Sequence, residues 1–255
     1  MEKIKNFEND ILLGVNIDHI ATLRNARGEN FPSPLLAAQI ALESGAHSIV
    51  CHLREDRRHI KDDDIFNIKK NINCPLNMEM ALRDDVIKIS FDLKPYKVTI
   101  VPENREEITT EGGLDVNKSF SILKDLTKEY KKNCIEVFLF IEPSKKDVEL
   151  SAKLEVTGIE FHTGRYSNLY GKEQIDEFIK IKEMSKIAYE SGLKVAAGHG
   201  LNYQNVLKIA SIPEIFELNI GFSIISNAIF NGLKNAVKDM LVLMRIGKNL
   251  SLKDL

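Results

Sequence analysis

Eight short apolar runs of strand length alternate along this chain with longer segments whose apolar residues recur at helical spacing. The runs lie at 12–18, 47–53, 75–80, 96–101, 135–141, 158–163, 193–199 and 216–221. The helical segments lie at 34–45, 62–72, 84–94, 117–132, 144–156, 173–192, 202–212 and 226–247. Such alternation in 255 residues predicts an α/β fold of the (β/α)8, or TIM barrel, type, because a doubly wound sheet usually has fewer strands.

The composition favours one soluble domain spanning 1–255, since no linker or shift in composition divides the chain. With 35 basic and 37 acidic residues the net charge is −2, so no overall field favours nucleic acid or an anionic membrane. The apolar stretches are shorter than the roughly 18 residues of a membrane span. The polar N-terminal extension, 1–10, has no signal-peptide core, and we therefore expect a cytoplasmic protein.

Three cysteines, Cys51, Cys74 and Cys134, lie far apart, with no CxxC pair and no histidine at ligand spacing. This spacing argues against a disulfide framework and against a zinc site. We expect reduced, mostly buried thiols and no metal.

Polar residues alternate with apolar residues toward the ends of the predicted strands. In a barrel strand, alternate side chains point into the lumen and the others point toward the helices. The apolar set contains Val15, Ile17, Ile49, Cys51, Leu53, Leu76, Met78, Met80, Ile159, Phe161, Leu218 and Ile220. The polar set contains Asn16, Asp18, His52, Arg54, Asn77, Glu79, Glu160, His162, His199 and Asn219. Buried polar groups are costly unless they pair or bind a ligand, so we expect a site at the C-terminal ends of the strands.

The segment HLREDRRHI, 52–60, places three arginines and two histidines beside two acids at the end of the second strand. Arg54 and His59 are the best candidates for binding an anion, because a guanidinium matches phosphate geometry and a histidine adds a donor. For Arg57 and Arg58 an alternative stays open. The neighbouring acids can cross-link the loop, in which case these arginines serve structure or a subunit contact.

Glu79, Glu160 and His199 are candidates for proton transfer. Glu79 stands between two methionines, and an apolar setting disfavours the ionised carboxylate, which is how enzymes poise a general base. A Glu79 paired with Arg54 or another cation is the alternative. Glu160 and His162 are both polar, and one of them can simply orient its neighbour. His199 lies between two glycines that let the backbone approach a ligand closely.

Two further segments are typical of phosphate binding. The seventh and eighth strands lead into helices through GHGLNYQN and NIGFSIISNA, and barrels often bind phosphate at helix N-termini in this position. The loop 108–116 offers a threonine, Thr109, beside paired glycines and is a candidate lid. His19, Arg24 and Arg27 follow the first strand and are expected to reach the cavity.

Seven motifs are spread in order over nearly the whole chain: GVNIDHIATLRNARG, HLREDRRHI, NMEMA, TTEGGLDV, FHTGRY, AGHGLNYQNV and ELNIG. Together they resemble the family of pyridoxine 5'-phosphate synthases in the deoxyxylulose-dependent vitamin B6 pathway. The resemblance implies a (β/α)8 barrel with extra helices, assembled as a homo-octamer without a cofactor. It implies a ring-closing transferase that condenses 1-deoxy-D-xylulose 5-phosphate with 3-amino-2-oxopropyl phosphate into pyridoxine 5'-phosphate, phosphate and water.

The resemblance also implies residue roles. His52 and Glu79 would accept protons, His199 would donate one, and Glu160 would stabilise a transition state. The residues implied for the deoxyxylulose phosphate are Asp18, His19, Arg54, His59 and Thr109. Those implied for the amino ketone phosphate are Asn16, Arg27, Gly200 and the turn of Gly221 and Phe222.

One departure from the family pattern is Phe222, which stands where the family usually has histidine after NIG. Two rival functions stay open. One is a sugar-phosphate isomerase or epimerase that acts on a single substrate without releasing phosphate. The other is a barrel that binds phosphate metabolites without turnover, against which the three proton-transfer candidates argue.

Overall fold

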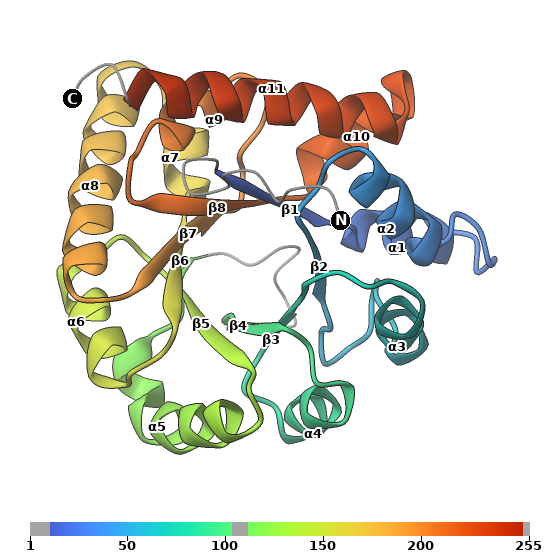
Figure 1. The fold of residues 1–255 in the computed structure, drawn as a ribbon, viewed down its shortest axis with the longest axis horizontal. Coiled ribbons are helices and arrows are strands. Elements are labelled where there is room, and N and C mark those ends of the chain that lie inside the picture. The colour runs from blue at the N-terminus through green and yellow to red at the C-terminus, as the bar shows by residue number, and fades with distance from the viewer. Residues whose placement is uncertain (1–10, 104–111, 252–255) are drawn as a thin grey trace, which may run out of the picture.

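The fold is a closed barrel of parallel strands surrounded by helices (Figure 1). The computed structural model describes residues 11–103 and 112–251. Within these ranges eight strands pair in chain order, and β8 closes the barrel against β1. They are β1 Leu12–Asn16, β2 Ser48–His52, β3 Leu76–Met80, β4 Lys97–Ile100, β5 Glu136–Ile141, β6 Gly158–His162, β7 Lys194–Gly198 and β8 Ile215–Ile220. The predicted barrel is therefore confirmed.

Helices follow the strands around the outside of the barrel. They are α1 Asp18–Asn25, α2 Pro34–Glu43, α3 Asp62–Asn71, α4 Asp84–Leu93, α5 Val116–Lys132, α6 Lys145–Lys153, α7 Gly164–Asn168, α8 Gly171–Glu190, α9 Val206–Ala210, α10 Phe222–Asn231 and α11 Leu233–Ser251. The structure differs from the sequence-based prediction in three places: α1 and α7 are additional, and the last predicted helix begins earlier and is divided. Gly232, with a φ of 77°, separates α10 from α11. Glycine suits this position because a residue with a side chain rarely adopts that backbone angle.

The first strand ends earlier than predicted because of a local side-chain bond. The side-chain oxygen of Asn16 accepts the backbone N–H of Asp18 at 2.9 Å. Such a turn offers the backbone an alternative to the strand ladder. The helix α1 therefore begins at Asp18, which the sequence analysis had placed in the strand.

The two sets of strand residues separate as predicted. The apolar set packs between the sheet and the helices, where Val15, Ile49, Met78, Phe161 and Leu218 are fully buried. In the lumen, polar residues of the other set contact one another and three polar strand residues that the prediction did not include, Lys97, Thr99 and Glu217. These contacts are Lys97 with Glu217, Thr99 with Asn77, and Asn219 with Glu160.

Two glycines make room for these lumen side chains. A Cβ atom at Gly198 would overlap the Glu160 carboxylate, and one at Gly14 would overlap the amide oxygen of Asn219. The absence of a side chain at these two positions is what lets Glu160 and Asn219 meet inside the barrel.

In the part of the chain that the structure describes, no helix is long and apolar enough to cross a bilayer. All three cysteines are free. The expectation that the thiols are mostly buried is wrong for Cys134, which is exposed, and Cys74 is half-buried. Cys134 lies in the turn between α5 and β5 with φ of 57°, and this turn faces solvent.

Candidate active site

A cavity of about 780 Å³ opens at the C-terminal ends of the strands. Most of the predicted site residues line it, although they come from distant parts of the chain. These are Asn16, Asp18, His19, His52, Arg54, His59, Glu79, Glu160, His199, Gly200, Gly221 and Phe222. Side chains that the prediction did not include also line it, among them Thr22, Phe140, Asn202 and Ser223.

Three residues expected near the cavity lie elsewhere or outside the described ranges. The Arg27 side chain is 80% exposed, pairs with Glu29 at 3.3 Å and does not line the cavity. Arg24 also does not line it: two of its nitrogens bind the two oxygens of Asp64, which ties α1 to α3. The expectation for Arg24 was wrong because the turn of α1 directs its guanidinium to α3. Thr109 lies outside the described residues.

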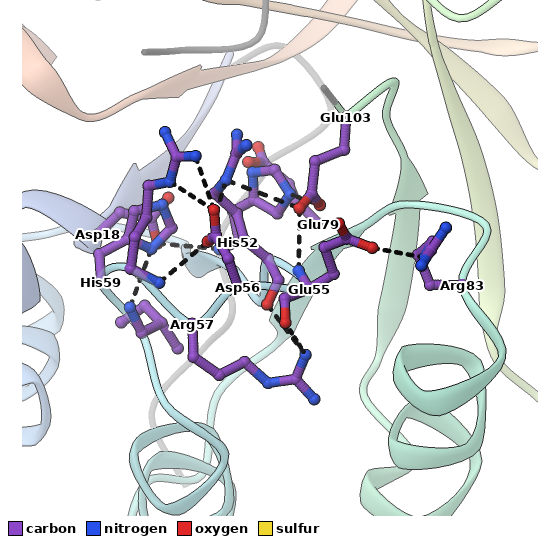
Figure 2. A network of polar contacts seen from close by, with 12 residues as sticks. Asp18, His52, Glu55, Asp56, Arg57, His59, Glu79, Arg83 and Glu103 are labelled. Carbon is purple, nitrogen blue, oxygen red and sulfur yellow. Dashed lines mark hydrogen bonds and ion pairs between the residues drawn. The ribbon is translucent and has the colours of Figure 1, made fainter. Parts of the chain in front are cut away.

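The predicted anion site at the end of β2 holds a carboxylate of the protein itself (Figure 2). The Glu103 side chain is 3% exposed and lies 3.3 Å from His52 Nε2 and 3.7 Å from Arg54 Nε. It also accepts the backbone N–H of Glu55 at 2.9 Å. Burial raises the pKa of Glu103, but the contacts with His52, Glu55 and Arg54 outweigh it and the pKa is lowered. The site thus already stabilises one negative group.

The sequence analysis missed Glu103. The one signal for it was an acidic residue shortly after the fourth strand, on the face where barrels carry their chemistry. That position is in a loop, so no strand alternation indicated the direction of the side chain.

Arg57 and Arg58 support the structural alternative. Arg57 binds Asp62 at 2.8 Å and Asp85 at 3.1 Å and donates to two backbone carbonyls, so it fixes the shape of the loop. Arg58 binds the carboxylate of Asp56 with two nitrogens, at 2.6 and 2.9 Å, and also lines the cavity. Partial burial opposes ionisation of Asp56, but the hydrogen bonds from Arg58 lower its pKa to about 2. The acids cross-link the loop.

Asp18 and His59 are held in fixed orientations beside this loop. One Asp18 oxygen accepts the backbone N–H of His52 at 2.9 Å, and the other accepts the side-chain N–H of Asn16 at 2.8 Å. His59 Nδ1 accepts the backbone N–H of Ile60 at 2.9 Å, which leaves Nε2 to carry the ring proton. Burial, together with the nearby positive groups, lowers the pKa of His59. Its neutral ring is therefore a hydrogen-bond donor toward the cavity.

Asp18, His52 and His59 offer three ligand atoms that lie within 4.8 Å of one another. A zinc ion with bonds of about 2.0–2.2 Å would need these atoms closer together. The guanidinium of Arg54 adds a positive charge to the same region, and His52 already contacts Glu103. The arrangement suits an anion better than a cation.

Two carboxylates that interact electrostatically lie deeper in the cavity: Glu160 is buried and Glu79 is half-buried. Burial raises the pKa of Glu79 well above its ordinary value, and the charges of Glu160 and Asp18 raise it further. Burial likewise raises the pKa of Glu160 to about 7, although Lys97 and the hydrogen bond from Asn219 act against it. Asn16 lies 3.5 Å from Glu79, and Asn219 donates to Glu160 at 2.6 Å. Groups that exchange protons near neutral pH suit acid–base catalysis.

His199 lies on the opposite side of the cavity in a left-handed backbone conformation, with φ of 75°. Thr163 holds this turn, since its hydroxyl donates to the carbonyl oxygens of Gly198 and His199 at 2.7 and 2.6 Å. Burial lowers the pKa of His199 to about 4, and His162, whose ring centroid is 5.0 Å away, adds to the effect. A conformation that is strained for a non-glycine residue is typical of a functional site.

His162 does not line the cavity. Its Nδ1 lies 2.7 Å from a carboxylate oxygen of Glu142, which also accepts the backbone N–H of Gly113. Of the two polar residues of β6, Glu160 reaches the cavity and His162 packs behind His199.

The residues that open α10 line the far end of the cavity, and no side chain caps this helix, whose first turn has backbone N–H groups without helical partners. Gly221 precedes the helix, and a Cβ atom there would lie 2.8 Å from Cβ of Asn16. The Phe222 side chain is 68% exposed, and its ring meets His19 edge-on at 5.1 Å between centroids. The Ser223 hydroxyl donates a hydrogen bond to the carbonyl oxygen of Leu201 at 2.7 Å.

Comparison with known proteins gives the family. Residues 13–246 match the family model described as "Pyridoxal phosphate biosynthesis protein PdxJ". The chain belongs to the PdxJ family. A pyridoxine 5'-phosphate synthase of Sulfurihydrogenibium sp. (strain YO3AOP1) is 54% identical over 231 residues, which cover 89% of this chain and 95% of the relative. One of Prochlorococcus marinus (strain MIT 9515) is 51% identical over 91% of this chain and 98% of the relative.

Solved structures that resemble this PdxJ chain are similar in fold alone. A BexX/CysO complex from Amycolatopsis orientalis gives a TM-score of 0.65 at 10% identity, covering 100% of this chain and 96% of the other. A phosphoribosyl anthranilate isomerase of Thermotoga maritima gives 0.60 at 13% identity, covering 92% and 98%.

The raised pKa of Glu160 predicts how stability depends on pH in this PdxJ protein. Because its pKa is about 7 in the folded chain against an ordinary 4.5, the folded state holds the proton more tightly than the unfolded state. The stabilising contribution is complete below pH 4.5 and is lost as the pH rises to about 7. Glu160→Gln should remove this dependence.

We therefore expect the free energy of unfolding of Glu160→Gln, relative to the unaltered protein, to increase by about 1–3 kcal/mol between pH 4.5 and 7.5. Urea unfolding at a series of pH values measures it. Glu183→Gln, a change at an exposed position of α8, is the control and should show no such trend. A constant difference between Glu160→Gln and the unaltered protein would contradict the prediction.

Proposed function

We propose that the protein is a pyridoxine 5'-phosphate synthase, which condenses 1-deoxy-D-xylulose 5-phosphate with 3-amino-2-oxopropyl phosphate and releases phosphate and water. Its support from comparison is the PdxJ family match and the curated relatives at about half identity along nine-tenths of the chain. The structural observation that carries it is one cavity with anion-binding groups at both ends and buried acid–base groups between them.

Each phosphate is bound in a different way. The deoxyxylulose phosphate binds over β2, where Arg54 and His59 supply donors and Asp18 and His19 line the sugar side. The amino ketone phosphate binds at the N-terminus of α10, beside Gly200, Gly221 and Asn16. Thr109 and Arg27 belong to the proposed substrate contacts by family resemblance alone.

The chemistry needs several proton transfers in one enclosed place. The amine condenses with a ketone and loses water, protons leave carbon as phosphate and a further water depart, and closure gives an aromatic ring. His52 and Glu79 accept protons, and His199 donates one. Glu160, on β6 in the lining of the cavity, stabilises a transition state. Groups positioned around one cavity make these steps effectively intramolecular.

The protein acts on small phosphorylated molecules and uses no cofactor in this proposal. By resemblance to its family it works in the cytoplasm as a homo-octamer. Sedimentation velocity at working concentration measures the assembly, and a monomer with full activity would contradict this part of the proposal.

The proposed reaction predicts that phosphate release requires both substrates together and accompanies the absorbance of a pyridinol. Either substrate alone should release none above background. The measurement is a phosphate assay with both substrates and with each one singly. Full phosphate release from one substrate would exclude the condensation, whereas isomerisation of one without release would support a sugar-phosphate isomerase. Binding of both with no turnover would indicate a non-catalytic barrel.

Glu79→Gln should fold normally and lose turnover by on the order of a hundredfold or more, because it removes a general base and keeps the shape. Substrate binding should persist, which calorimetry measures. Glu183→Gln on the surface of α8 is the matched control and should keep full turnover. Near-normal turnover of Glu79→Gln at saturating substrates would make Glu79 a structural residue.

Gly221→Val should raise the Michaelis constant for the amino ketone phosphate by at least about a hundredfold, since a side chain there meets Asn16 and blocks the backbone approach. Phe222→His should change it by no more than about tenfold, the value of one ordinary hydrogen bond, because backbone N–H groups hold that phosphate. Steady-state kinetics compares the two. A harmless Gly221→Val would place the second phosphate elsewhere.

A further inference from the structure

A charged pair, Lys97 and Glu217, lies inside the barrel beneath the cavity. Their side chains are 3% and 7% exposed, and Lys97 Nζ lies 2.5 Å from a Glu217 oxygen. The same ammonium group lies 4.4 Å from the centre of the Phe138 ring. An apolar pair of similar volume is often as stable as a buried ion pair or more so. Stability alone therefore gives no reason for charges at this place.

The strand register puts Lys97 one layer below Glu79 and Glu217 at the level of Glu160. Glu79 is aligned with Thr99, so Lys97, two residues earlier on β4, lies one layer below Glu79. Glu217 and Glu160 are both aligned with Ala196 on the strand between them. Glu217 is thus level with Glu160, and its ion pair with Lys97 crosses the lumen from β8 to β4.

We propose that Lys97 is a positioning residue for the reaction: its positive charge, held by Glu217 at the floor of the cavity, keeps Glu79 able to ionise. This inference rests on the proposed function, in which Glu79 accepts a proton. Two like charges close together in a dry lumen resist ionisation, and a cation beneath them reduces that resistance.

The charged groups around these carboxylates support this role. Asp18 and Glu160 disfavour the charged form of Glu79, and Lys97 is the cation that favours it by lowering its pKa. His52 is the register neighbour of Glu79 on β2. Lys97 also lowers the pKa of Glu160, while Glu217 raises it.

The acidic neighbour of Lys97 on β5 is already paired. Glu136, aligned with Lys97, accepts a hydrogen bond from Lys194 at 2.6 Å. Asn77, on β3, is occupied by the Thr99 hydroxyl at 2.9 Å. The ammonium group of Lys97 is thus held in place by Glu217 and acts on the carboxylates through space.

The test compares pH profiles of kcat. In Lys97→Met the limb on which the general base loses its proton should move to higher pH, with turnover at pH 7 reduced at least about threefold and recovered near pH 9. Because this change leaves Glu217 unpaired, Lys97→Met combined with Glu217→Leu is made as well, and it should fold and show the same shift. Lys97→Arg keeps the charge and should restore the profile.

Lys194→Met is the matched control, since it breaks a lysine–glutamate pair at the rim of the same end of the barrel. It should leave the profile unchanged. A folded double variant with the profile of the unaltered protein would overturn the inference.

A second readout does not depend on turnover. The C=O band of protonated carboxyl groups, followed by infrared difference titration of the full-length protein, should persist to higher pH in the double variant. If the band titrates identically with and without Lys97, the inference fails even if the enzyme is active. If the unaltered protein releases no phosphate from the two substrates, the proposed function fails, and the infrared titration still decides the role of Lys97.

Discussion

The lumen of this barrel contains ionisable groups in a space with little room for water. The rest of the site depends on how the charges of these groups are compensated. A buried charge is stable only if a partner or ligand compensates it. At the floor the compensation is complete, because Lys97 and Glu217 pair with each other. Glu160, at the level of Glu217, has a neutral partner, Asn219, and Glu79 has an amide nitrogen at 3.5 Å. Compensation is therefore least complete at these two carboxylates, whereas toward the mouth His52 and Arg54 lie beside the carboxylate of Glu103.

The strands and the composition of the lumen could be predicted from the sequence because both follow one short period. All eight strands lie within two residues of the predicted ranges. The same alternation identified Glu79 and Glu160 as lumen residues. Outside the strands, the alternation of polar and apolar residues does not predict where a side chain points. Arg24 was expected in the cavity but turns to Asp64, and Glu103 was missed because its loop position carries no alternation.

The start of the short helix α1 was not predicted, because a local side-chain hydrogen bond decides it and the alternation of apolar residues does not reveal that bond. The run LLGVNID is strongly apolar at its start and predicts a strand as far as residue 18. One hydrogen bond from the Asp18 backbone to Asn16 ends it. That bond also fixes the position of Asp18, whose carboxylate accepts a hydrogen bond from the backbone N–H of His52. A deviation from the predicted boundary is thus the feature that joins β1 to the anion site of β2.

The two ends of the cavity use different physical means to hold negative charge. Over β2 the donors are side chains, and Glu103 shows that a carboxylate already fits among His52, Arg54 and the Glu55 backbone. At α10 the donors are backbone N–H groups, which every residue except proline supplies. The proposed function therefore predicts that substitution is restricted at Arg54 and tolerated at the side chain of residue 222. The family resemblance implies histidine at this position, and here Phe222 begins α10 and packs against His19. Phe222 thus changes the wall of the cavity, while the backbone N–H groups in the first turn of α10 are the same with either side chain.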